Sequence, residues 1–123
     1  MELRGVHHIS LNVADAAATE RFYVDVLGLK PLDRPDFGFP GAWLACQDGR
    51  QVHLIQVDDW VAPKGQHFAF AVEDIEGVRG ELAAKGIKVS DTSVVPGAGR
   101  QCFFKDPAGN LVELNQPAGA GVA

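Results

Sequence analysis

Residues 6–13 read V-H-H-I-S-L-N-V, and residues 66–72 read Q-H-F-A-F-A-V. Both stretches alternate between apolar and polar or small side chains, and this period of two predicts a half-buried β-strand in each place. In the first strand the apolar side chains share one face, while His8, Ser10 and Asn12 share the other. In the second strand His67 lies opposite the phenylalanines. The two strands therefore indicate an internal repeat.

A helix is predicted directly after each of these strands. Asp15 and Asp74 stand at the two predicted starts, and Gly28 and Gly86 stand just past the two predicted ends. An aspartate that accepts hydrogen bonds at the first turn and a glycine that follows the last turn are the usual helix-capping residues.

Three short strands are expected after each helix. In the first half they cover about residues 29–34, 42–46 and 51–57, and in the second half about 88–94, 101–105 and 110–115. The order β-α-β-β-β then occurs twice. We therefore expect a first module over 1–58, a linker over 59–65, a second module over 66–117 and a flexible tail over 118–123.

Composition narrows the choice of partners and compartment. The chain has 123 residues and a net charge of −5, with two cysteines. An acidic chain without basic runs is a poor partner for nucleic acid or an anionic membrane surface. Two cysteines without paired spacing favour a reducing compartment. The N-terminus lacks the layout of a signal peptide, and no apolar stretch is long enough to span a bilayer. The cytoplasm is the expected location.

The repeat selects four candidate metal ligands. His67 follows His8 by 59 residues, and Glu113 follows His53 by 60 residues, so each pair occupies equivalent strand positions. Three imidazoles and one carboxylate suit zinc, iron(II), manganese, nickel or cobalt. Glu113 is flanked by apolar residues, and a metal would compensate the cost of burying its carboxylate. Taken singly, a strand histidine is more often only hydrogen-bonded, and such a glutamate is more often a rim charge.

Other residues are weaker candidates for the site. Ser10 and Asn12 could hydrogen-bond a substrate oxygen or only meet water. Arg100 could grip a substrate carboxylate or be a solvated surface residue. The aromatic stretch 35–43 is either an apolar lid over a cavity or core packing at a turn. His7 is expected to be structural, on the helix-facing side of its strand.

Five motifs resemble the vicinal-oxygen-chelate superfamily, which includes glyoxalase I, extradiol dioxygenases and bleomycin resistance proteins. The resemblance covers about residues 4–116. The motifs are G-V-H-H-I-S-L-N-V-A-D at 5–15, F-Y-V-D-V-L-G-L at 22–29, Q-V-H-L-I at 51–55, H-F-A-F-A-V-E-D-I at 67–75 and F-F-K-D-P-A-G-N-L-V-E-L at 103–114.

This resemblance implies an α+β fold in which two βαβββ modules form a curved eight-stranded mixed sheet around a metal cavity. It places the ligands of one divalent metal ion at His8, His53, His67 and Glu113. Unpaired strand edges and the resemblance together favour a homodimer. The metal could lie within one chain or between two chains.

The implied activity is that of a metal-dependent lyase, isomerase or dioxygenase acting on a small oxygen-rich molecule. Two positions depart from glyoxalase I: Asn12 stands where an arginine helps to hold glutathione, and His53 stands where a glutamate is usual. Glu113 is the candidate catalytic base, or it only holds the metal. The alternative function is a small-molecule binding or sequestering protein of the bleomycin-resistance type, without metal chemistry.

Overall fold

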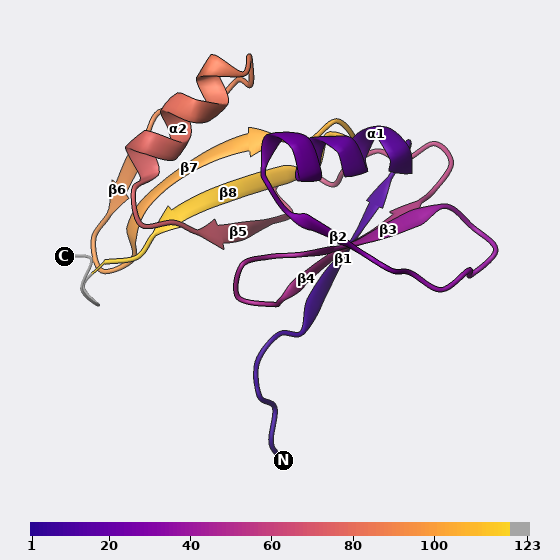
Figure 1. Cartoon of the computed structure of the whole chain (residues 1–123). Coiled ribbons are helices and arrows are strands. Elements are labelled where there is room, and N and C mark those ends of the chain that lie inside the picture. Colours follow the sequence, from indigo (N-terminus) through magenta and orange to yellow (C-terminus); the bar gives the residue numbers. More distant parts are fainter. Residues whose placement is uncertain (119–123) are drawn as a thin grey trace. The chain divides into compact units, whose positions relative to one another are not determined.

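The structure is a computed structural model that describes residues 1–118 (Figure 1). The chain divides into two compact units, Met1–Val61 and Ala62–Ala123, and each is described by itself. Apart from residue 118, the tail predicted at 118–123 lies outside the described residues.

The first unit contains one four-stranded sheet in the order β1-β4-β3-β2. β1 and β4 are parallel, and the other neighbours are antiparallel. The elements are β1 (His8–Val13), α1 (Ala16–Arg21), the π-helix η1 (Phe22–Val26), β2 (Lys30–Leu32), β3 (Gly41–Ala45) and β4 (Gln51–Gln56).

The second unit repeats this arrangement with a sheet in the order β5-β8-β7-β6. Its elements are β5 (His67–Ala71), α2 (Ile75–Ala84), β6 (Ser93–Val95), β7 (Gly99–Lys105) and β8 (Leu111–Gln116). The predicted α+β class with two βαβββ modules is confirmed. Its eight strands are divided equally between two mixed sheets.

Both helices begin at the predicted aspartates. The Oδ1 atom of Asp15 accepts a hydrogen bond from the amide of Ala18, and that of Asp74 accepts one from the amide of Gly77, each at 3.0 Å. Each bond satisfies one of the amides that have no partner inside the first turn. The repeat therefore extends to the way each helix starts.

A second bond ties each helix start to the last strand of its own unit. The side-chain Oε1 of Gln56 accepts from the amide of Ala16 at 3.0 Å. The Oε1 of Gln116 accepts from the amide of Ile75 at 2.9 Å. These glutamines end β4 and β8, so the helix start is fixed to the strand that carries the candidate ligand.

The first helix differs from the single regular helix that the sequence predicts. α1 ends at Arg21 and continues as the wider η1, in which the amide of Leu27 reaches the carbonyl of Phe22 at 3.2 Å. Phe22 and Tyr23 are adjacent in sequence, and both are buried. A π-turn adds one residue to the turn, and here it accompanies the burial of two consecutive aromatic side chains.

The core of each unit lies between its helix and the covered face of its sheet. Val52 and Leu54 supply that face in β4, and Val112 and Leu114 supply it in β8; all four are nearly inaccessible to solvent. The residues between them project from the other face, because alternate strand residues point to opposite sides. Among residues 1–118, no helix is long and apolar enough to cross a membrane.

Candidate metal and substrate site

In the first unit, the open face of the sheet carries a row of stacked rings. The strand register sets Ser10 beside His53 and His53 beside Trp43. The His8 ring stacks on His53 with the centroids 4.0 Å apart, and the Trp43 ring stacks on it at 4.6 Å. Since both rings are nearly parallel to His53, they lie on its opposite faces. Two of the predicted ligands, His8 and His53, are thus in contact.

The environment of His53 favours its neutral form. The side chain is buried, with 9% of its surface exposed, and its Nε2 lies 2.7 Å from the Oε1 of Gln51. Burial lowers the pKa of His53, and the charges of His8, His7 and Arg34 lower it further. A histidine must be neutral to bind a metal, so this environment suits a ligand.

His7 does not lie where the sequence analysis placed it. It precedes β1, is exposed, and its Nδ1 lies 2.9 Å from the Nδ1 of His8. The expected helix-facing position is therefore wrong. β1 begins only at His8, so the strand alternation does not extend to His7.

In the second unit, His67 and Glu113 form a direct pair. The Oε1 of Glu113 lies 3.0 Å from the Nε2 of His67, and its Oε2 accepts from the Nδ2 of Asn115 at 2.9 Å. Only 7% of Glu113 is exposed. The Nδ1 of His67 lies 2.8 Å from the carbonyl oxygen of Gly65, to which it can only donate. The buried carboxylate thus has a partner at each oxygen.

Each unit supplies one pair of candidate ligands. Within residues 1–118, no group of three or more His, Cys, Asp or Glu side chains gathers in a way that could hold a metal ion. That all four donors share one ion remains a prediction.

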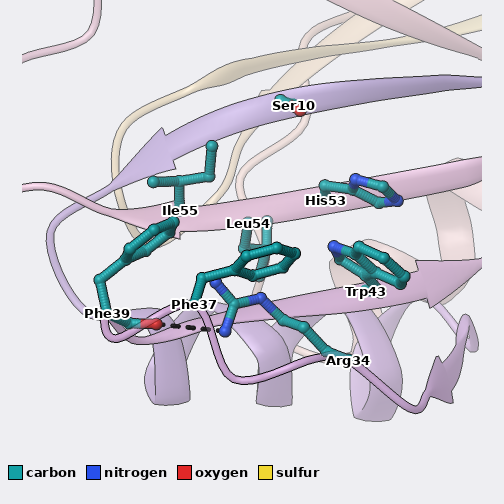
Figure 2. A pocket seen from close by; sticks show the side chains of 8 residues that line it. All are labelled: Ser10, Arg34, Phe37, Phe39, Trp43, His53, Leu54 and Ile55. Atoms are coloured by element: carbon teal, nitrogen blue, oxygen red, sulfur yellow. Dashed lines mark hydrogen bonds between the residues drawn. The ribbon is translucent and has the colours of Figure 1, made fainter.

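A cavity of about 200 Å³ opens beside His53 in the first unit. Phe37, Phe39 and Trp43, the three aromatic residues of the stretch 35–43, all contribute to it, as Figure 2 shows. Phe37 and Phe39 are about half exposed, which favours the lid interpretation over core packing. The cavity is lined by Ser10, Arg34, Phe37, Phe39, Trp43, His53, Leu54 and Ile55.

Among the substrate candidates, Ser10 lines this cavity. Asn12 lies on the same face of β1, where it pairs in register with Ile55. Both positions agree with the face that the alternation predicted.

Arg100 lies elsewhere. Along β7 it is an odd number of residues from Phe103, which pairs with Glu113, so Arg100 projects from the opposite face of the strand. It lies near Glu76 on the helix side: hydrogen bonds from Thr92 and Arg79 lower the pKa of the Glu76 carboxyl, and the Arg100 charge adds to this. The geometry gives no support to a role for Arg100 beside Glu113.

Arg34 lines the cavity and was not among the sequence candidates. Its guanidinium lies 4.9 Å from the ring centre of Phe37 and 5.1 Å from that of Phe39. Its Nη1 donates to the carbonyl oxygen of Phe39 at 3.1 Å. The alternation of apolar and polar residues does not identify a single arginine between a strand and an aromatic stretch as a cavity residue.

The chain belongs to the Glyoxalase/Bleomycin resistance protein/Dioxygenase superfamily, whose family model matches residues 5–114. Members of this superfamily include lyases and dioxygenases, and they generally bind a divalent metal.

Three similar proteins illustrate this range. The lactoylglutathione lyase of Haemophilus influenzae is 29% identical, over 87% of this chain and 88% of its own. A glyoxalase family protein from Enterococcus faecalis is 30% identical, with a TM-score of 0.80, over 94% of this chain and 100% of its own. TnmS3, an antibiotic binding protein from Streptomyces sp. CB03234, is 28% identical, with a TM-score of 0.79, over 96% of this chain and 99% of its own.

Proposed function

We propose that this protein is a divalent-metal-dependent enzyme of the glyoxalase/dioxygenase type, acting on a small oxygen-rich molecule. The observation that carries the proposal is the equivalence of the two ligand pairs. His8 with His53 and His67 with Glu113 occupy matching strands and the same open sheet face in the two units.

The residues fit a metal such as zinc, iron(II), manganese, nickel or cobalt. Metal-binding histidines usually donate their second N–H to a backbone carbonyl or a carboxylate, which leaves the other nitrogen free as a ligand. The bond from Nδ1 of His67 to the Gly65 carbonyl has this form, and a bound metal would replace the present contact between the Nε2 of His67 and the Oε1 of Glu113. The lowered pKa of His53 keeps a second imidazole neutral. We propose His8, His53, His67 and Glu113 as the ligands of one ion, within one chain or between two.

A bound divalent metal would supply Lewis acidity toward two adjacent oxygens of a substrate. The chain itself would supply proton transfer and positioning. Glu113 is the proposed base, because its carboxylate is buried and held at both oxygens by His67 and Asn115. A carboxylate so placed can accept a substrate proton within hydrogen-bond distance. The Ser10 hydroxyl, in the cavity wall beside His53, would orient a substrate oxygen.

Elemental analysis tests this proposal first. Protein purified without added metal and then loaded should retain close to one divalent ion per chain after dialysis, and Glu113→Gln should retain much less. The loaded protein should then turn over a hemithioacetal, a catechol or a related compound with adjacent oxygens. Retention of no divalent ion by the wild-type protein would refute the proposal.

A binding or sequestering role is the second candidate. Two observations favour it: the similarity to the antibiotic binding protein TnmS3, and the aromatic lining of the cavity. Such a protein would bind its ligand equally well with and without metal and leave it unchanged. Comparing ligand recovery after incubation with loaded and metal-free protein separates the two functions.

We also propose that the protein is a cytoplasmic homodimer. In each sheet the outer strands, such as β1 and β2, have a hydrogen-bonded neighbour on one side only, and such edges favour association. Sedimentation should give a species of twice the 13.1 kDa chain mass. A stable species of single-chain mass across micromolar concentrations would contradict this.

A further inference from the structure

The cavity beside His53 has a feature that the proposed metal chemistry does not use: a guanidinium among aromatic rings. Figure 2 shows Arg34 with Phe37 and Phe39, facing the side of the sheet that carries Trp43 and His53. Apolar and aromatic side chains make up most of the wall. Arg34 is only partly exposed, and a charge against such a wall loses part of its hydration, which favours a partner for it.

Arg34 has no ion-pair partner in the part of the chain that the structure describes. Across residues 1–118, no aspartate or glutamate lies within ion-pair distance of it. Its one hydrogen bond, to the Phe39 carbonyl, uses one of the five N–H donors of a guanidinium. The remaining donors form the planar fork that matches a carboxylate.

The backbone makes room for this arginine. A β-carbon at Gly41 would lie 2.8 Å from the Nη2 of Arg34 and 2.9 Å from its Cζ, too close for any real contact. The same atom would lie 2.3 Å from the carbonyl oxygen of Leu54. The Leu54 oxygen alone requires glycine at this position, and the guanidinium lies in the space beside it.

The other walls suit a flat molecule. The rings of Trp43 and Phe37 have centroids 6.1 Å apart and are tilted by 46°, so they form adjoining parts of one aromatic wall. Flat rings pack well against such faces. The volume of about 200 Å³ is below the roughly 300–1,000 Å³ typical of sites for drug-sized ligands. A ligand of single-ring size would fill this volume.

We propose that this cavity binds an aryl carboxylate, with the carboxylate on Arg34 and the ring against Trp43 and Phe37. This proposal rests on the proposed function in one respect. The end of the ligand away from the carboxylate would lie beside Ser10 and His53, where the proposed reaction would occur. Recognition of the acid itself needs residues of the first unit alone.

The test is calorimetric titration of metal-free protein with benzoate and with benzamide, a neutral analogue of the same shape. We expect benzoate to bind at least ~10-fold more tightly, the effect of a charge-assisted bond. Arg34→Gln should remove this preference and leave benzamide binding within about twofold of wild type. Arg100→Gln is the matched control, since this exposed arginine lies near Glu76 in the second unit, and it should keep the preference.

Equal binding of the two compounds by wild-type protein, or no binding of either at millimolar concentration, would overturn the proposal. So would a preference lost in Arg100→Gln and kept in Arg34→Gln. If Arg34→Gln fails to fold, Arg34→Lys keeps the charge without the fork and should lose at least ~3-fold of the preference; an unchanged preference overturns the proposal.

Because the titration uses metal-free protein, it separates this proposal from the proposed function. A protein that retains no metal but prefers benzoate would refute only the metal-dependent reaction. A protein that retains metal but shows no preference would refute only the aryl carboxylate site.

Discussion

The two units place different side chains at equivalent positions of their two sheets. In β4 this position is His53, stacked on Trp43; in β8 it is Glu113, which pairs in register with Phe103. The neighbours on the first strands differ as well, since Ser10 stands where the second unit has an alanine.

This difference suggests a division of labour in a duplicated scaffold. The first unit surrounds its histidines with rings, a cavity and an arginine without an acidic partner among residues 1–118, which are features that we propose recognise a ligand. The second unit surrounds its carboxylate with His67 and Asn115, which are partners that position a base. The shared backbone pattern fixes where a side chain projects, and the residue type decides what it does there.

The largest effect should come from removing the charge of the second unit. Glu113→Gln keeps the shape of the side chain, and we expect metal affinity to fall by at least ~10- to 100-fold, since even changes to the partners of metal ligands cost that much. The fold should persist, because Val112 and Leu114 carry the core on the other face. Glu81→Gln, exposed on α2, is the control. Chelator competition measures affinity, and wild-type affinity in Glu113→Gln would show that the first unit binds the ion alone.

Substitutions of the histidines test how much each unit contributes to metal affinity. His8→Ala and His67→Ala should each lower metal affinity by at least ~10-fold, because each removes a ligand from a different unit. His7→Ala should have the smaller effect, since His7 contacts His8 but is not a proposed ligand. The same chelator competition applies. A greater loss in His7→Ala than in His8→Ala would show that the wrong histidine has been assigned as the ligand.

Mild acid should remove the metal. Free histidine titrates near ~6.5, and protons compete with the metal for neutral imidazoles below that pH.

The lowered pKa of His53 means that this imidazole stays neutral to lower pH than a free histidine. The unfolded chain then takes up a proton before the folded protein does, so His53 makes stability fall as pH drops below ~6.5. NMR titration of His53 and metal content at pH 8 and 5 under chelation test this; unchanged occupancy at pH 5 would contradict it.

Much of the fold could be predicted because its signals are local. The alternation around Ile9 and Phe68 and the aspartates that start the helices each depend on a few neighbouring residues. The open-face position of Ser10 follows from the same alternation and is confirmed by the register.

The cavity could not be predicted in the same way. The role of Arg34 depends on where Phe37 and Phe39 lie and on the space above Gly41, which are tertiary facts. The position of Arg100 was open to prediction, since it shares its face with Cys102 by the same period of two. The signal was missed because the strand was expected to begin at residue 101 and not at Gly99.

A smaller effect should show whether the hydrogen bonds at the two helix starts contribute equally to stability. Gln56→Ala and Gln116→Ala each remove a half-buried acceptor from a helix amide, and each should lower the free energy of unfolding by about 0.5–1.5 kcal/mol. Urea denaturation of the two variants, each compared with wild type, measures this. A loss several times larger in one variant would show that the two bonds are equivalent in geometry only.

The smallest effect should come from Glu76 on α2, whose side-chain contacts have no described counterpart in the first unit. Glu76 accepts hydrogen bonds from Arg79 and Thr92, which link α2 to the following segment. These bonds lower the pKa of Glu76, so its contribution is present above the usual glutamate pKa and is lost as pH falls through the lowered value. Glu76→Gln should therefore lower the melting temperature slightly at pH 7 and less at pH 3. An equal decrease at both pH values would contradict this.

The segment at residues 33–40 connects β2 to β3 and carries Arg34, Phe37 and Phe39. It lies outside the paired strands, although the carbonyl of Pro40 accepts a hydrogen bond from the amide of Gln56. The candidate ligand His53, by contrast, sits between the buried Val52 and Leu54, so a shift of one residue would move it into the core. Insertions and substitutions can therefore accumulate in the connection while the ligand stays in place. In evolutionary terms, the shape of the cavity can change without disturbing the proposed ligand positions.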